Sequence, residues 1–253
     1  MPWLPTTSRL AAPNPRAPDQ HVDVVPRPGE WRRIAGVDEA GRGPWAGPVV
    51  AAAVILPAPL RRVRIDDSKR LSALQRARAF DAILRRARVG VGVVCAEEID
   101  RVNILRATLA AMAQAVGELR PAPELVLVDG NTAPPIPMAC WPIIGGDRRY
   151  GLIACASIVA KVVRDELMAF YHELYPAYEF IRHKGYGTSL HAERLAALGP
   201  SLLHRHSFEP VRATLLPLIG EPSPSDADRA EPAPEARADE RTARPSPVAL
   251  ERL

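Results

Sequence analysis

The chain has 253 residues, of which 47% are hydrophobic and 25% charged, proportions that are typical of a soluble globular protein. It contains no apolar run of about 18 residues and no leader of a charged and then an apolar block, so the sequence predicts neither a membrane-spanning helix nor secretion. The net charge of +4 is unevenly spread: residues 221–253 carry eight acidic and five basic side chains, which leaves +7 on residues 1–220. Such a basic body favours a polyanionic partner, because phosphates neutralised by Lys or Arg release their counterions.

The three cysteines, Cys95, Cys140 and Cys155, are odd in number and stand among apolar neighbours. This usage predicts buried free thiols, which persist in a reducing compartment. We therefore expect a cytoplasmic protein.

Proline is enriched near the two ends of the sequence. Residues 1–30 and 218–253 show no periodic apolar face, and segments of this composition bury too little apolar surface to offset the entropy of ordering. We expect both to be disordered tails that flank a folded domain over residues 31–217.

The domain opens with two apolar runs, residues 34–37 and 49–56, separated by the acidic pair Asp38-Glu39 and a Gly-Arg-Gly-Pro turn. This pattern predicts a β-hairpin with carboxylates at the end of its first strand. Ser72 then serves as the N-cap of a predicted helix, and a strand over residues 89–94 would complete an antiparallel meander. The apolar stripe expected on that helix comprises Leu74, Ala77, Phe80, Ile83 and Leu84.

The second half of the domain alternates between helical and strand patterns, which is typical of an α/β protein. Its continuously apolar run at residues 124–129 predicts a central strand covered on both faces. A basic, glycine-hinged loop spans residues 180–189. A long helix is predicted over residues 97–119, with Leu105 in its apolar stripe, and an edge strand over 136–144. A second long helix follows Asp147, with Phe170 in its apolar stripe and with Lys161 and Arg164 pointing elsewhere. Shorter helices are predicted over residues 190–198 and 207–216.

Four carboxylates stand at strand ends or a helix start: Asp38, Glu39, Asp129 and Asp147. If the strands of Asp38 and Asp129 are sheet neighbours, their acids converge at one edge. Buried carboxylates need a compensating cation, which an arginine or a divalent metal ion supplies. Oxygen-rich clusters suit Mg²⁺ or Mn²⁺, and two such ions can drive phosphodiester hydrolysis. The alternatives are an exposed acidic pair in an ordinary hairpin, an N-cap role for Asp147, and a simple turn at Asp129-Gly130-Asn131.

Histidine offers a competing idea, because His183, His191, His204 and His206 lie near one another in the sequence. No cysteine pairs accompany them, and the His-x-His spacing alone is unspecific for zinc. Histidines that are solvated or that contact phosphate are the preferred interpretation.

Taken together, four blocks in this order resemble the type 2 ribonuclease H family, bacterial ribonuclease HII. The similarity covers residues 33–216, and the ordered set is far more specific than any one block. The blocks are Gly36-Val37-Asp38-Glu39-Ala40-Gly41-Arg42-Gly43-Pro44 with Ala46-Gly47-Pro48-Val49, then Asp67-Ser68-Lys69, then Asp129-Gly130-Asn131, and finally Gly146-Asp147 through Ala156-Ser157-Ile158-Val159-Ala160-Lys161-Val162 to His183-Lys184-Gly185-Tyr186-Gly187-Thr188.

This resemblance implies a ribonuclease H-like fold, with a mixed five-stranded sheet flanked by helices. It implies an endonuclease that cuts the RNA strand of RNA–DNA hybrids and nicks DNA 5′ of an embedded ribonucleotide by two-metal-ion hydrolysis, leaving a 3′-hydroxyl and a 5′-phosphate. Matched motif by motif, Asp38, Glu39, Asp129 and Asp147 are the catalytic acids that bind Mn²⁺ or Mg²⁺. The implied substrate-binding residues are Gly41, Arg42, Gly43, Lys69, Ser157, Lys161, Lys184, Tyr186 and Thr188.

The physical roles implied for these residues are distinct. Glycines at 41 and 43 let the backbone approach a ribose 2′-hydroxyl, the group that separates RNA from DNA. Tyr186 would pack on the neighbouring deoxyribose, although a half-buried packing role is the alternative, and Lys161 could simply face solvent. A catalytically silent binding module would lack one of the acids, and a nuclease that cuts DNA alone would lack the Gly-Arg-Gly turn and Tyr186. We expect a monomer, because no spare apolar helix face is evident.

Overall fold

The computed structural model describes residues 31–58, 60 and 63–215. Within these residues the strands form one mixed sheet in the order β3-β2-β1-β4-β5. The two expected tails lie outside the described residues. The strands are β1 (Ile34–Ala40), β2 (Val49–Ile55), β3 (Arg88–Val94), β4 (Leu125–Asp129) and β5 (Ala139–Ile143), and the helices are α1 (Ala73–Arg86), α2 (Ala96–Val102), α3 (Ile104–Gly117), η1 (Gly146–Arg148), α4 (Gly151–Leu174), η2 (Pro176–Tyr178), α5 (Phe180–His183), α6 (Ser189–Leu198) and α7 (Glu209–Ala213).

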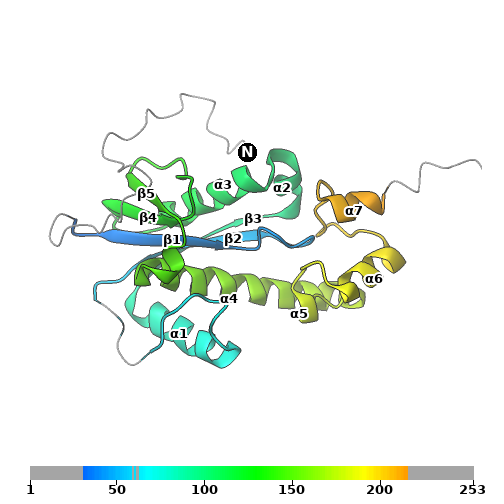
Figure 1. Cartoon of the computed structure of the whole chain (residues 1–253), viewed down its shortest axis with the longest axis horizontal. Helices are drawn as coiled ribbons and strands as arrows, with labels where there is room; N and C mark the ends of the chain where they lie inside the picture. The colour runs from blue at the N-terminus through cyan, green and yellow to red at the C-terminus, as the bar shows by residue number, and fades with distance from the viewer. Residues whose placement is uncertain (1–30, 59, 61–62, 216–253) are drawn as a thin grey trace, which may run out of the picture. The chain divides into compact units, whose positions relative to one another are not determined.

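The sheet lies between two helical layers (Figure 1). Helix α3 packs on β2 and β3, while α4 packs on β1 and β2 from the opposite side and carries α1 on its outer surface. The first three strands are antiparallel, and β4 joins β1 in parallel. The predicted meander and the predicted central strand are therefore both confirmed.

Small residues in the sheet allow the helices to approach closely. Every residue of β2, Val-Val-Ala-Ala-Ala-Val-Ile, is buried, because both faces are covered. On β1, a Cβ added to Gly36 would lie 2.2 Å from the backbone carbon of Leu152 in α4. On β3, a Cβ added to Gly92 would lie 2.0 Å from the backbone oxygen of Ala111 in α3. These glycines set how near each helix lies to the sheet.

The predicted helix over residues 97–119 is wrong in one respect, because the chain breaks at Asn103. This residue has φ +74°, a conformation that asparagine tolerates better than most residues, and its side chain accepts a hydrogen bond from the Arg106 N–H at 3.1 Å. The break yields two helices, α2 and α3. Asparagine caps helices well, so the sequence carried a signal for this boundary.

The apolar stripes were predicted too broadly. Ser72 does cap α1, with a capping box to Gln75. Only Ala79 and Ile83 of α1 are buried, however, in a core cluster with residues of α4 and β2, so Leu74 and Leu84 are exposed. Leu105 and Phe170 are likewise exposed on their helices, and Arg164, expected to point away from the core, is fully buried.

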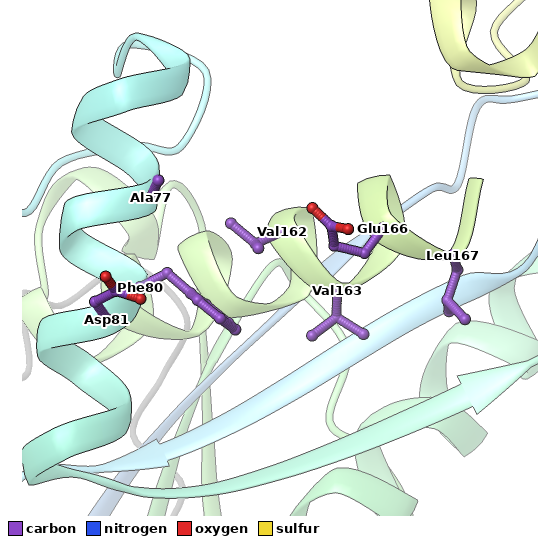
Figure 2. A pocket seen from close by; sticks show the side chains of 7 residues that line it. All are labelled: Ala77, Phe80, Asp81, Val162, Val163, Glu166 and Leu167. Atoms are coloured by element: carbon purple, nitrogen blue, oxygen red, sulfur yellow. The ribbon is translucent and has the colours of Figure 1, made fainter. Parts of the chain in front are cut away.

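A groove separates α1 from α4, and Figure 2 shows the Phe80 ring reaching from α1 toward α4. The groove has a volume of about 480 Å³. Its walls are mainly apolar, so a spare apolar helix surface does exist, and the monomer stays a prediction. The residues that line it are Ala77, Phe80, Asp81, Val162, Val163, Glu166 and Leu167.

Among the described helices, none is long and apolar enough to cross a membrane. Cys140 and Cys155 are buried free thiols as expected, whereas Cys95 is exposed at the start of α2. Burial raises the pKa of the Cys140 and Cys155 thiols to about 12, so both stay protonated at neutral pH.

Replacing Gly36 with alanine is expected to destabilise the domain, because the new methyl group would overlap the backbone of α4 at Leu152. Relief requires α4 to move away from β1, so we expect a loss of about 3 kcal/mol in the free energy of unfolding, measured by urea denaturation. Gly117→Ala is the control, since a Cβ there meets nothing within 4 Å. Equal stability of the two variants would contradict the close approach of α4.

Candidate active site

The sheet register brings two of the predicted acids to the same edge. Strand β1 pairs in parallel with β4, and Val37 lies opposite Val128. The next residues along the two strands are Asp38 and Asp129, which therefore lie side by side at the carboxyl ends of neighbouring strands. Asp38 is buried, with 5% of its surface exposed, and Glu39 follows it in β1. The expected convergence of these acids is confirmed.

Hydrogen bonds hold two of these carboxylates in place. Asp38 accepts from the Glu39 N–H at 2.7 Å and from the Ser157 hydroxyl, which comes from α4. Asp129 accepts from the Gly146 N–H at 2.7 Å. That second bond ties η1, which carries Asp147, to the end of β4.

Asp147 does not cap the long helix that follows it. It lies in η1, and the N-cap of α4 is Tyr150, which makes no side-chain capping bond. The N-cap alternative for Asp147 is therefore wrong. Its carboxyl group lies close enough to Asp129 and Asp67 to feel their charges.

Burial and mutual repulsion both act against ionisation of the acids. Burial raises the pKa of Asp38 well above its ordinary value, and the charges of Glu39 and Asp129 raise it further. Burial also raises the pKa of Glu39, although Arg42 at 3.4 Å partly opposes that effect. For Asp147, burial and the charge of Asp129 raise the pKa. The cluster therefore holds more negative charge than its protein surroundings neutralise.

This donor set fits a hard divalent cation, because carboxylate oxygens are the ligands that Mg²⁺ and Mn²⁺ prefer, and a cation would relieve the repulsion. The side chains are not preassembled around one point: in the described part of the chain, no three His, Cys, Asp or Glu side chains converge closely enough to hold a metal ion. The nearest basic partner, Arg42, is exposed, and an ion pair of that kind contributes little.

A fifth carboxylate, Asp67, belongs to the same neighbourhood and was not predicted. Asp67 and Ser68 are both buried, and Arg148 of η1 lies 3.8 Å from the Asp67 carboxylate. Ser68 shares a hydrogen bond of 3.0 Å with Ser157, the residue that also bonds Asp38. Within the Asp67-Ser68-Lys69 block, the family resemblance implies a role for Lys69 alone.

The Gly-Arg-Gly turn follows β1, and the Arg164 side chain of α4 packs against it. Gly41 has φ +96°, and a Cβ there would lie 2.1 Å from Nε of Arg164, so only glycine fits. Gly43 faces open space, and Arg42 is exposed. The turn therefore presents bare backbone beside the acids.

A second loop lies against this turn and carries Tyr186. The N–H groups of Trp45 and Ala46 both donate to the Gly185 carbonyl oxygen, at 2.8 and 3.3 Å. The Tyr186 side chain is 40% exposed, and the Arg164 guanidinium carbon lies 5.5 Å from its ring centroid. The aromatic ring is thus available at the surface next to the turn.

The predicted basic and hydroxyl residues fall into three groups. Lys161 pairs with Asp165 at 2.5 Å and lies 6.0 Å from the Tyr186 ring centroid, and Lys184 donates to the Asp165 carbonyl at 3.4 Å, so both lie in this neighbourhood. Lys69 is exposed on the turn after Asp67. Thr188 caps α6 by accepting from the His191 N–H at 3.2 Å, which is a local structural role.

The predicted solvent exposure of the histidines is wrong for three of the four, because only His206 is exposed. His183, His191 and His204 are buried in one aromatic cluster, with the rings of His183 and His191 stacked 4.3 Å apart. Nε2 of His191 lies 3.1 Å from Nε2 of His204. Burial lowers the pKa of His191 to about 4 and that of His204 to about 3, so both rings are neutral at pH 7.

Comparisons with known proteins identify the family of this chain. A family model described as Ribonuclease HII matches residues 35–211. Ribonuclease HII of Geobacter sulfurreducens is 50% identical over 205 residues, which cover 76% of this chain and 94% of that protein. Ribonuclease HII of Chlamydia muridarum is 53% identical over 188 residues, covering 73% and 86%. The crystal structure of ribonuclease H2 from Pyrococcus horikoshii matches with a TM-score of 0.61 at 26% identity, covering 72% of this chain and 96% of that one.

The fold and the relatives place the protein among the type 2 ribonucleases H, which are endonucleases that hydrolyse phosphodiester bonds. Within that class, the chain belongs to the ribonuclease HII family. The predicted ribonuclease H-like fold, with its mixed five-stranded sheet in the described residues, is confirmed.

Asp38→Asn is expected to stabilise the protein in chelator at pH 8. Because the pKa of Asp38 is higher in the folded chain, the folded state holds its proton more tightly, and wild-type stability falls as pH rises above the ordinary aspartate range. The variant lacks this loss, so its advantage is greatest at pH 8 and shrinks toward pH 4. Urea denaturation at the two pH values measures it.

Asp66→Asn is the control for that experiment. Asp66 is ion-paired with Arg64, and the hydrogen bond from Arg64 lowers its pKa, so the substitution should not stabilise the protein at either pH. A destabilised Asp38→Asn variant at pH 8 would show that the Asp38 charge is compensated in the folded protein.

Proposed function

We propose that Asp38, Glu39, Asp129 and Asp147 are the catalytic residues and together bind Mn²⁺ or Mg²⁺. The observation that carries this proposal is the group of mutually repelling carboxylates, buried at Asp38 and partly buried at the other three, at the ends of β1 and β4 and in η1. When bound, two divalent ions would activate the attacking water and stabilise the leaving oxygen in phosphodiester hydrolysis. The protein's own contribution is orientation: Ser157 and the Glu39 N–H aim Asp38, and the Gly146 N–H aims Asp129.

The proposed substrate is the RNA strand of an RNA–DNA hybrid, or a single ribonucleotide embedded in duplex DNA. Bare backbone at Gly41-Arg42-Gly43 would meet the ribose 2′-hydroxyl, which DNA lacks. The exposed Tyr186 ring would lie on the neighbouring deoxyribose, where an extra hydroxyl would fit poorly. The enzyme would then cut 5′ of the ribonucleotide and leave a 3′-hydroxyl and a 5′-phosphate.

Basic side chains around the site would hold the phosphates of the substrate. Lys161 and Lys184 lie in the neighbourhood of Tyr186, and Lys69 lies exposed after the buried Asp67. Contacts of this kind give affinity without sequence preference and weaken as salt is added. Ser157 acts through Asp38, and Thr188 acts by capping α6.

We also propose that residues 31–217 suffice for catalysis, that the protein acts as a monomer, and that it works in the cytoplasm. The matched region, residues 35–211, lies within this domain. The buried free thiols Cys140 and Cys155 suit a reducing compartment.

The test of the proposed function is a nicking assay on a labelled DNA duplex with one ribonucleotide, compared with an all-DNA duplex and an RNA–DNA hybrid. We expect a nick 5′ of the ribonucleotide in Mn²⁺ or Mg²⁺, none in chelator and none on all-DNA. Asp129→Asn should abolish the nick while duplex binding persists, because it removes a proposed ligand without adding charge. Cleavage of the all-DNA duplex, or full activity of the variant, would contradict the proposal.

Tyr186→Ala is expected to reduce nicking at single ribonucleotides more than cleavage of long hybrids, by about tenfold, the scale of one aromatic contact with a nucleotide. A long hybrid offers the enzyme many registers and depends less on the junction. Phe170→Ala is the control: it removes an exposed aromatic ring that lies on α4, and it should change neither rate. Equal losses on both substrates would exclude a junction role for Tyr186.

A further inference from the structure

Arg205 lies near the end of the described domain in sequence, yet its side chain binds the Gly-Arg-Gly turn that follows β1. Its side chain is fully buried, and its guanidinium donates only to backbone carbonyls. Nη2 donates to the Gly41 oxygen at 2.6 Å, and Nη1 donates to the Arg42 oxygen at 2.9 Å. Nε and Nη2 both donate to the Gly47 oxygen, at 3.0 and 2.9 Å. One side chain thus binds the backbone of the turn, at Gly41 and Arg42, and the backbone just before β2, at Gly47.

These bonds determine which way the turn's N–H groups face. In a trans peptide the C=O of one residue and the N–H of the next point in opposite directions. Since the Gly41 and Arg42 carbonyls point inward to Arg205, the N–H groups of Arg42 and Gly43 point outward. In the part of the chain that the structure describes, neither N–H has a protein acceptor, and the space beside Gly43 is open.

The charge of Arg205 is costly to bury without compensation. Among the described acids none is ion-paired with Arg205, although the charge of Asp100 acts on it, and burial lowers the pKa of its guanidinium to about 9. The Phe208 ring lies 5.1 Å from its guanidinium carbon. The guanidinium is bound by backbone carbonyls at Gly41, Arg42 and Gly47 and packs on an aromatic face. Its hydrogen bonds to the described residues therefore all fix the backbone in and just after the turn.

We infer that Arg205 is a positioning residue for recognition of the ribose: it turns the peptide groups after Gly41 and Arg42 so that two N–H donors face the substrate. This inference rests on the proposed function of the Gly-Arg-Gly turn. It goes further by assigning the orientation of the turn to one buried side chain from the 204–208 segment. Arg205 itself is shielded from the substrate and acts only through the turn.

The experiment compares Arg205→Met and Arg205→Lys with the wild type on a single-ribonucleotide duplex. An all-DNA duplex serves as a competitive inhibitor, so the ratio of its Ki to the KM of the ribonucleotide duplex measures discrimination by the 2′-hydroxyl. We expect the ratio to fall about tenfold in Arg205→Met, the scale of one lost hydrogen bond, through a higher KM. Arg205→Lys keeps some donors and should restore part of it.

Destabilisation alone would give a different result, because it lowers the active fraction and hence kcat while KM, Ki and their ratio stay constant. Met112→Ala, at a buried core position of α3 on the other face of the sheet, is the matched control for stability and should leave the ratio unchanged. If Arg205→Met does not fold, Arg205→Lys decides the question. A folded Arg205→Met variant with the wild-type ratio overturns the inference, and so does a wild-type ratio in Arg205→Lys where Arg205→Met does not fold. A wild type that fails to nick at ribonucleotides overturns the proposed function instead.

Discussion

The close contact between α4 and β1 determines the arrangement of the whole site. Gly36 lets the helix backbone touch the strand, and from there the two elements run side by side. The same face of α4 then presents Ser157 to Asp38 and Arg164 to Gly41. Residues seven positions apart share a helix face, so a single packing contact aligns both the acids and the turn.

Two charged groups of opposite sign lie along this helix, one of buried and partly buried acids and one of fully buried arginines. The acids on β1 and β4 carry negative charge that protein cations barely offset, while Arg164 and Arg205 are buried cations whose hydrogen bonds go to carbonyls. Each group is costly on its own. The negative group fits a metal ion, and the cations behind the turn fit a polyanionic substrate on its outer side. These costs are consistent with a site whose charges are completed by ligands.

Local patterns were enough to predict most of the fold and the convergence of Asp38 and Asp129 at one edge of the sheet. Alternation and turn residues predict the meander, and the apolar run before Asp129 predicts a central strand whose neighbour carries Asp38. What failed depends on tertiary packing. Arg164 and the histidines have polar side chains that usually face water, and only the partners brought by distant segments explain their burial.

The 203–208 segment shows why these partners escape sequence reasoning. Its backbone joins the turn through the Gly47 N–H, which donates to the Leu203 oxygen at 2.8 Å, and the Arg205 N–H, which donates to the Trp45 oxygen at 2.8 Å. These pairs lie more than 150 residues apart, and no local period or motif spacing encodes them. The acids form where neighbouring strands end, a position that a sequence pattern can mark. The turn is contacted instead by Arg205 from the last part of the domain, so the packing around it requires both ends of the domain to fold together.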